Sequence, residues 1–459
     1  MAVQKKDPHF TDITPEIQAL ADICKANDII DPMLFFKYNV KRGLRDVNGK
    51  GVLTGLTEIA EVKSYTIDDD EIVPCEGKLY YRGYEIRDLV NAFTKERRFG
   101  FEETTYLLIF GKLPTEKDLK GFNSLLAHYR SLPTNFVRDV VMKAPTREMM
   151  NTLSRSILTL YPYDNNPDDV CVDNVLRQCL QLIAVTPLLA VYGYHTYRHY
   201  KEGGSLVIHQ PDPSMSTAET ILHLLRDDSK FTKFEASVLD LCLVLHADHG
   251  GGNNSTFTNR VVTSTLTDTY SAISASLASL RRPRHGGANL KVVGMMDDIK
   301  AHVNNLEDDE ELTKYLKKIL RGKAYDKQGL IYGMGHAVYT ISDPRAVLLK
   351  KFVERLAEEK GAAEEFKFYQ RIERLAPQII MEGHDSARSD IAVNVDFYSG
   401  LVYRLLGLPE ELFTPLFAIA RMSGWAAHRL EELATGGKII RPAYKNIVKH
   451  AKYVPIKKR

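Results

Sequence analysis

Amphipathic helical spacing recurs along this chain and constrains its fold more than any other feature. In EELTKYLKKILRGK (310–323), apolar side chains fall on one helix face, with lysines opposite, at Leu312, Tyr315, Leu316, Ile319 and Leu320. The segment SDPRAVLLKKFVERLAEEKG (342–361) carries its own boundaries. Asp343 can cap a helix, Pro344 suits its first position, and Gly361 suits its end. The spacing predicts a mainly α-helical protein.

Strand-like sequence is sparse and lies near the start of the chain. GLTEIAEV (55–62) and GKLYYRGY (77–84) have the composition of short strands, and the acidic run DDDE (68–71) lies between them. We therefore expect one small β hairpin near residues 55–84 on a helical body.

Length, charge and cysteine usage narrow the class of protein. The 459 residues are 44% hydrophobic, which is enough for a large core and more than one compact unit. Lys and Arg number 61 against 59 acidic residues, without a basic block, so nucleic-acid binding is not expected. The five cysteines form no C-x-x-C pair, which argues against structural zinc and favours a reducing compartment.

The sequence predicts neither a secretory signal nor a membrane span. Its start, MAVQKKDPHF, is polar, unlike a secretory signal. The longest apolar runs, such as IAVTPLLAVYGY (183–194), are shorter than a bilayer span. We expect a cytoplasmic protein with no membrane association.

The segment LHADHGGGNNS (245–255) combines imidazole, carboxylate and glycine. His246 and His249 are one helical turn apart with Asp248 between them, which fits a metal site, a catalytic site or a helix end equally well. The preceding residues, EASVLDLCLVLHADH (235–249), are apolar almost all round. They predict a buried helix that delivers its polar end to an interior site.

Three further segments carry similar chemistry: RRPRHGGAN (281–289), YGMGHAVYTISDPR (332–345) and NVDFYSG (394–400). Together with the first segment, they place three histidines beside glycines that allow close approach to a ligand, at His249, His285 and His336. Asp396 has apolar neighbours, and burial among them would raise its pKa. Arginines recur at Arg345, Arg421 and Arg441. This set of side chains suits a small polycarboxylate that reacts at a carbonyl group.

The four segments, in this order, closely resemble citrate synthases. The resemblance continues after these segments with FAIAR, GW, H and K-x-x-RP. It begins before them with GKLYYRGYEIRDL (77–89) and FEETTYLLIFGKLPT (101–115). It therefore covers the chain from about residue 50.

The resemblance implies a two-domain, mainly α-helical citrate synthase-like fold with a small N-terminal β element. The large domain would hold residues 1–285 and 400–459, and the small domain residues 286–399. It also implies a homodimer.

The resemblance further implies a reaction of the tricarboxylic acid cycle. The family condenses acetyl-CoA with oxaloacetate and hydrolyses the product thioester, with the CoA thioester as substrate and no separate cofactor or metal. By this resemblance, His285 of P-x-H-G-x-A-N is a neutral donor to the thioester oxygen. Asp396 of N-V-D removes a methyl proton, and His336 of G-x-G-H polarises the ketone of oxaloacetate.

The remaining implied roles concern substrate binding. His249 and the arginines Arg345, Arg421 and Arg441 would hold the carboxylates of oxaloacetate, with Arg441 contributed by the partner subunit. Leu330, Gly333 and Gly335 would contact CoA. The sequence departs from the family at Thr340, where many members have a basic residue near the CoA phosphates. The neighbouring arginines that could compensate are Arg281, Arg282 and Arg284.

Other functions remain open on the sequence. A 2-methylcitrate synthase, which uses propionyl-CoA, would carry the same motifs. A metal-dependent hydrolase could use the histidines and Asp396 as ligands, although the arginines would then face a cation. A non-catalytic helical scaffold of the same shape would not need an apolar-flanked carboxylate.

Overall fold

The computed structural model describes residues 11–46, 51–68, 71–281, 285–336, 338–382 and 391–459. The chain divides into two compact units, Met1–Leu56 and Thr57–Arg459. In the first unit, two helices are described, α2 (Pro15–Asn27) and α3 (Met33–Lys37), and neither buries a residue. The chemistry-bearing segments all belong to the second unit.

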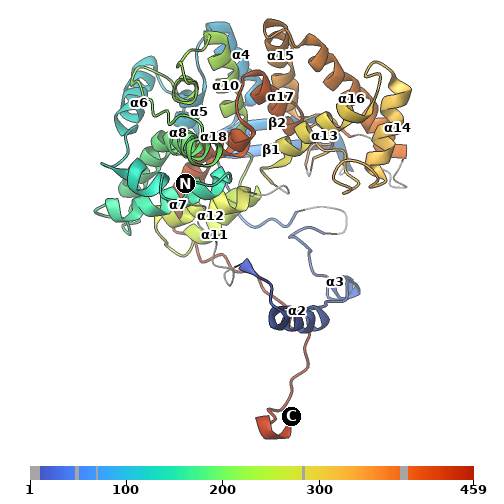
Figure 1. Ribbon diagram of the computed structural model, residues 1–459. Coiled ribbons are helices and arrows are strands. Elements are labelled where there is room, and N and C mark those ends of the chain that lie inside the picture. Colours follow the sequence, from blue (N-terminus) through green and yellow to red (C-terminus); the bar gives the residue numbers. More distant parts are fainter. Residues whose placement is uncertain (1–10, 47–50, 69–70, 282–284, 337, 383–390) are drawn as a thin grey trace. The chain divides into compact units, whose positions relative to one another are not determined.

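The second unit begins with a small antiparallel sheet of β1 (Ala60–Asp68), β2 (Glu71–Tyr81) and β3 (Tyr84–Glu85), in which β1 lies beside β2 (Figure 1). The predicted hairpin is therefore present, but its strands differ from the expected ranges. Residues 55–59 are not in a strand, and backbone pairing continues to Asp68 opposite Glu71. The ladder reaches this pair because strand pairing is made by main-chain groups rather than by side chains.

Helices make up most of the second unit. Those in its first half are α4 (Ile86–Glu96), α5 (Phe101–Phe110), α6 (Glu116–Tyr129), α7 (Met149–Leu160), α8 (Val172–Glu202), α9 (Thr217–Leu225), α10 (Lys233–His246) and α11 (Asn254–Thr263). Those in its second half are α12 (Thr269–Leu280), α13 (Ala288–His302), α14 (Asp309–Leu320), α15 (Pro344–Glu359), α16 (Ala363–Glu382), α17 (Val395–Leu405) and α18 (Phe413–Ala434). Short single turns occupy Val137–Val141, Tyr161–Tyr163, Glu410–Leu412 and Ile456–Lys458.

The helices predicted from periodicity are confirmed. α14 buries four residues of the predicted stripe, Leu312, Tyr315, Leu316 and Ile319, and the fifth, Leu320, is partly buried. α15 begins at Pro344, and the Asp343 side chain accepts the Arg345 main-chain N–H at 3.0 Å, as a cap does. The apolar helix expected over 235–249 is also present, but α10 ends at His246. The residues that follow it therefore form a loop rather than a further helical turn.

The longest helix, α8, contains the apolar run 183–194 and extends well beyond it. By length and composition α8 could cross a membrane, and it is the one such helix among the described residues. Its apolar window is 83% buried within the protein, as in the core helix of a globular domain. α8 packs against α18, in which every residue from Phe413 to Leu430 is buried. The paired α8 and α18 form the centre of the core.

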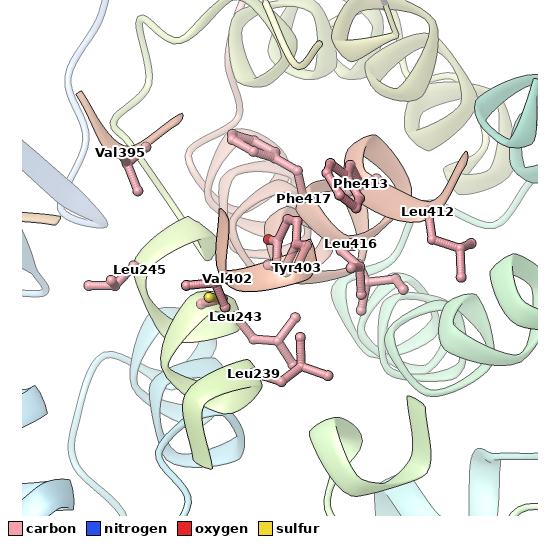
Figure 2. Packing of buried hydrophobic residues seen from close by; sticks show 14 of the residues in the cluster. Leu239, Leu243, Leu245, Val395, Val402, Tyr403, Leu412, Phe413, Leu416 and Phe417 are labelled. Atoms are coloured by element: carbon pink, nitrogen blue, oxygen red, sulfur yellow. The ribbon is translucent and has the colours of Figure 1, made fainter. Parts of the chain in front are cut away.

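Three helices that lead into the site pack directly on one another, as Figure 2 shows. Leu239 and Leu243 of α10 face Val402 and Tyr403 of α17, and the ring of Tyr403 lies 5.2 Å from that of Phe413 on α18. Each such side chain contributes about 1.5–3 kcal/mol when it is fully buried. The core thus fixes the frame that carries the polar residues.

The expected division into a large domain (1–285 and 400–459) and a small domain (286–399) remains a prediction. In the second unit, α13 packs on α17, α14 on α16, and α15 on both α17 and α10.

Gly424 on α18 marks the closest approach of α18 to the end of α10. Its N–H donates to the Ala247 carbonyl at 3.2 Å. A Cβ at this position would lie 2.5 Å from that carbonyl oxygen and would also collide with the Asp248 carboxylate. Only glycine fits here, because a main-chain oxygen cannot rotate away.

Gly424→Ala is therefore expected to lower the free energy of unfolding by about 1–3 kcal/mol, since it overpacks the crossing. The matched control is Gly121→Ala in α6, where an added Cβ meets nothing within 4 Å. That change should stabilise the protein by about 0.5–1 kcal/mol. Thermal and urea unfolding of the two variants would measure both effects, and equal midpoints would refute the packing argument.

Candidate active site

The loop after α10 carries buried polar side chains. His246, Asp248 and His249 are all less than 9% exposed. The hydroxyl oxygen of Tyr81, from β2, lies 3.1 Å from the main-chain oxygens of both Val244 and Asp248, and it accepts the Asp248 N–H at 3.3 Å. The sheet therefore anchors this loop, which is why the hairpin matters for the site.

The glycine-rich segment before His336 is paired with the segment before α17. The Asn394 N–H donates to the Gly333 carbonyl at 2.9 Å, and the Gly335 N–H donates to the Ala392 carbonyl at 2.8 Å. The Asn394 side-chain amide also donates to the Gly335 carbonyl at 2.9 Å. Gly333 has φ +81°, and a Cβ there would lie 2.9 Å from a ring carbon on α17. Two segments that are distant in the sequence thus become one rigid element.

Two predicted histidines meet at this element. The rings of His249 and His336 are 5.1 Å apart at an interplanar angle of 75°, and Tyr339 lies 4.8 Å from the His336 ring. Burial lowers the pKa of His249 well below its usual value, and Arg345 and His336 lower it further. His249 is thus uncharged at neutral pH, and its buried Nε2 has no hydrogen-bond partner within the described residues.

Main-chain groups fix the tautomer of His336. Its Nδ1 accepts the N–H of Val338 at 3.0 Å and that of Tyr339 at 3.2 Å. Because both main-chain groups can only donate, Nδ1 carries no proton in the neutral ring. The proton is therefore on Nε2, which makes that atom a hydrogen-bond donor.

His285 is held by residues that follow the His249 loop. Its Nε2 accepts the Ser255 N–H at 3.4 Å and lies 3.0 Å from the Ser255 hydroxyl, which in turn accepts from the Trp425 indole at 3.2 Å. Burial lowers the pKa of His285 to about 4, with a further contribution from Arg421. The ring is neutral at pH 7, and with Nε2 as acceptor its proton lies on Nδ1.

Asp396 lies in the first turn of α17, where the Asn394 side chain caps the helix and accepts the Asp396 N–H at 3.0 Å. Burial raises the pKa of Asp396 to about 6, although Arg345 and Arg421 oppose the shift. The apolar flanks predicted this direction. Its Oδ1 is buried and has no hydrogen-bond partner within the described residues. Such a carboxylate is a stronger base than an exposed one.

Arg345 is oriented by a carboxylate rather than free to turn. Its Nε and Nη2 donate to the two Asp343 oxygens at 3.0 and 2.7 Å, and the ion pair is almost fully buried. Asp343 also accepts the Val395 N–H at 3.2 Å. The same aspartate therefore aligns the guanidinium with the start of the helix that carries Asp396.

Arg421 is fully buried on α18. Its Nε donates to the His246 carbonyl at 2.8 Å, and its guanidinium lies 4.7 Å from the Phe417 ring. Nη1 and Nη2 have no hydrogen-bond partner within the described residues. Burial lowers the pKa of Arg421 to about 10, so it remains a cation at neutral pH. Two unmatched donors on a buried cation suit an anionic ligand.

Electrostatic interactions connect these groups as one cluster. Arg421 acts on Asp396, His249 and His285, and Arg345 acts on the first two. Among the described residues, no group of three or more His, Cys, Asp or Glu side chains is placed to hold a metal ion. Two buried guanidinium groups beside neutral imidazoles favour a carboxylate ligand over a cation.

Other predicted residues lie at the margin of this cluster or away from it. Leu330 is 54% exposed, and Arg441 is exposed in the chain that follows α18, where no described contact joins it to the cluster. Thr340 is exposed. Arg281 pairs with Glu148 at 3.1 Å. Arg282 and Arg284 lie outside the described residues.

Sequence reasoning did not identify several residues that shape the site. Ser255 orients His285, and Tyr339 packs against His336. Asp343 was predicted only as a helix cap, yet it also aligns Arg345. Trp425 is fully buried, and its indole donates to the Ser255 hydroxyl at 3.2 Å. No local pattern marks these partners, because each acts across the tertiary structure.

Comparisons with known proteins show which family the chain belongs to. Residues 48–443 match the family described as "Citrate synthase, C-terminal domain". A citrate synthase from Synechocystis sp. is 35% identical over 388 residues, 84% of this chain and 89% of the relative. A 2-methylcitrate synthase from Corynebacterium glutamicum is 32% identical over 426 residues, 92% of this chain and 98% of the relative.

Solved structures give the same result for the fold. The citrate synthase of Thermoplasma acidophilum, in a ternary complex with carboxymethyl coenzyme A and oxaloacetate, superposes with a TM-score of 0.73 at 26% identity. The match covers 91% of this chain and 98% of that one. The mainly helical fold, the clustered motifs and the match over most of the sequence lead to one conclusion: this chain is an enzyme of the citrate synthase family.

Proposed function

We propose that this enzyme condenses acetyl-CoA with oxaloacetate and hydrolyses the resulting citryl-CoA to citrate and free CoA. The observation that carries the proposal is that Asp396, a carboxylate of raised pKa, and the neutral imidazoles of His249 and His285 all interact with one buried guanidinium group, that of Arg421. This is the set of groups that an enolising thioester and a keto-diacid require.

Enolisation is the first chemical step. A thioester methyl group is a far weaker acid than any carboxylic acid, so a base alone generates little enolate. Asp396 removes the proton while Nδ1–H of His285 donates to the thioester oxygen, where negative charge develops. A general base typically contributes about 10²–10⁴-fold and one preorganised donor about 10²–10³-fold. Together the two residues provide both requirements.

Condensation and hydrolysis follow. The Nε2–H of His336 donates to the ketone oxygen of oxaloacetate, and the enol carbon attacks the polarised carbonyl carbon. Arg345, Arg421 and His249 hold the two carboxylates of oxaloacetate. Water then cleaves the citryl thioester, which releases CoA. The thioester is a substrate, and the proposal requires no separate cofactor or metal.

The assembly and location of the enzyme belong to the same proposal. We expect a cytoplasmic homodimer in which Arg441 of each chain completes the carboxylate site of the other. The exposure of Arg441 leaves it available for this contact. Leu330, Gly333 and Gly335 would contact CoA, since the backbone of this glycine-rich segment can approach a ligand closely.

A 2-methylcitrate synthase activity is the second candidate, because relatives with that name match at 30–32% identity. The test is release of free CoA from acetyl-CoA or propionyl-CoA in the presence of oxaloacetate. A higher kcat/KM for acetyl-CoA supports citrate synthesis, and a higher value for propionyl-CoA supports the alternative. No release with either thioester would contradict both and favour a non-catalytic scaffold. Loss of activity after chelation would favour a metal-dependent hydrolase.

The pKa of about 6 for Asp396 predicts a pH dependence. Only the carboxylate form can accept the proton, so activity is present above pH 6 and is lost as the pH falls through this value. Below pH 6, turnover is expected to fall by about tenfold per pH unit. Initial rates from pH 4.5 to 8 would measure this, with circular dichroism as the control for folding. A flat profile in the folded enzyme would contradict the role of Asp396.

A further inference from the structure

His428 lies on α18 in a fully buried position beside the substrate loop. Neither its side chain nor that of Asp248 has any exposed surface. The Nε2 atom of His428 is 3.2 Å from Oδ1 of Asp248, which is within reach of a hydrogen bond. Asp248 immediately precedes His249, for which we propose a role in holding oxaloacetate. A buried imidazole thus contacts the carboxylate next to a binding residue.

Arg260 of α11 decides how the His428 ring is protonated. Its Nη2 lies 2.7 Å from Nδ1 of His428, and a guanidinium can only donate. Nδ1 must therefore be an acceptor, and the ring proton is placed on Nε2, the atom that faces Asp248. Arg260 is held in turn by Glu431 and by Glu432, the latter at 2.9 Å. Arg260 thus donates to His428, and the Nε2–H that results lies 3.2 Å from the Asp248 carboxylate.

Asp248 has little freedom to move at the end of this chain. Its Oδ2 accepts the Gly250 N–H at 2.7 Å, and Gly424 leaves no room beyond its other oxygen. The main chain of Asp248 is tied to Tyr81. Neither Oδ1 of Asp248 nor Nε2 of His428 forms an aligned hydrogen bond with a described group, so the 3.2 Å contact between these two atoms is electrostatic, and it lowers the pKa of Asp248. An unmatched buried carboxylate oxygen is costly, so this contact decides where the carboxylate and the adjoining main chain settle.

We propose that His428 is a positioning residue: held as the Nε2–H tautomer by Arg260, it orients Asp248 and thereby sets the direction of the His249 ring toward the dicarboxylate substrate. The inference rests on the proposed function for the identity of that substrate. It assigns a role in recognition to a residue that does not itself touch the reacting atoms.

Two substitutions at His428 distinguish the effect of its hydrogen-bonding groups from the effect of its side-chain volume. His428→Leu fills the space but removes both the acceptor and the donor. His428→Gln keeps both, because its amide oxygen can accept from Arg260 and its amide N–H can donate to Asp248. We expect the leucine variant to raise the KM for oxaloacetate by about tenfold or more, while the KM for the acyl-CoA changes by less than about threefold. The glutamine variant is expected to stay within about threefold of the wild type for both.

Calorimetric titration of oxaloacetate into each variant measures the same effect without catalysis. His195→Leu, a change at a buried histidine on α8 that bonds to the Leu224 carbonyl at 3.0 Å, is the matched control and should leave oxaloacetate binding unchanged. If the leucine variant does not fold, Arg260→Leu tests the same series of contacts, because it removes the donor that fixes the His428 tautomer. Without Arg260 the His428 proton can move to Nδ1, and the KM for oxaloacetate should rise about three- to tenfold.

The outcomes distinguish this inference from the proposed function. If the wild-type protein neither binds oxaloacetate nor releases CoA, the proposed function fails. If the wild type does both, and folded His428→Leu or Arg260→Leu binds oxaloacetate normally, the positioning role is refuted. Equal losses in the leucine and glutamine variants would also refute it, because they would show that ring shape, not hydrogen-bond polarity, is what matters.

Discussion

Replacing Asp396 with asparagine is expected to lower the turnover number by about 10²–10⁴-fold. The change keeps the size of the side chain and removes its ability to accept a proton. Asp396 has a raised pKa of about 6, a buried oxygen without a described partner, and a position at the start of α17 that its asparagine cap fixes. Little structural change is expected, so the loss should fall on kcat rather than on folding.

The matched control for this variant is Asp240→Asn. Asp240 is also a buried aspartate, and burial raises its pKa well above the usual value, with Glu102 adding to the shift. It accepts the N–H groups of Gly100 and Phe101 at the start of α5 and takes no part in the cluster described above. Turnover in this control should remain within about threefold of the wild type. Near-normal turnover in Asp396→Asn would overturn the assignment of the base.

Replacing His285 with alanine is expected to lower turnover by about 10²–10⁴-fold as well, because it removes the donor to the developing charge on the thioester oxygen. The ring is neutral, since burial lowers its pKa to about 4, and the Ser255 N–H directs its proton to Nδ1. A neutral donor is suited to this step because it polarises the oxygen without first giving up its own proton. Steady-state rates at saturating substrate would measure the loss.

His195→Ala provides the comparison for this second variant. His195 is also buried, and burial lowers its pKa, but it lies in α8 away from the cluster. The control should lose stability, by about 1–3 kcal/mol for the unmatched partner it leaves, and keep its turnover once folded. If both alanine variants lose turnover equally, the effect of His285→Ala is structural, and the proposed donor is wrong.

Local patterns anticipated much of the fold because they arise from interactions between near neighbours. The stripe of α14 and the cap of α15 appear where periodicity and capping residues place them. The end of α10 was placed too late, since the loop is held by Tyr81 and by the crossing with α18, which the local sequence does not encode. The hairpin was found, but β1 starts later than predicted, because main-chain pairing rather than composition sets its ends.

Some features of the candidate site could likewise be predicted from the sequence, and others could not. The histidines beside glycine, the arginines and the apolar-flanked Asp396 could be selected from the sequence, because the type of side chain limits the chemistry. The direction of the Asp396 pKa shift could also be predicted, since apolar neighbours in the sequence indicated burial. The partners that tune these groups could not be predicted, and Asp343 was noticed only for its local role as a cap.

The sequence by itself therefore determined a helical protein, the side chains available for chemistry and, through its motifs, the citrate synthase family. Only the tertiary structure decided which ring nitrogen of His285, His336 and His428 carries the proton. It also decided which carboxylate aligns Arg345 and how Arg260 and His428 reach the loop that holds His249. The physical reason is that a tautomer or the direction of a guanidinium depends on hydrogen-bond partners within about 3 Å, and folding brings those partners together from distant parts of the chain.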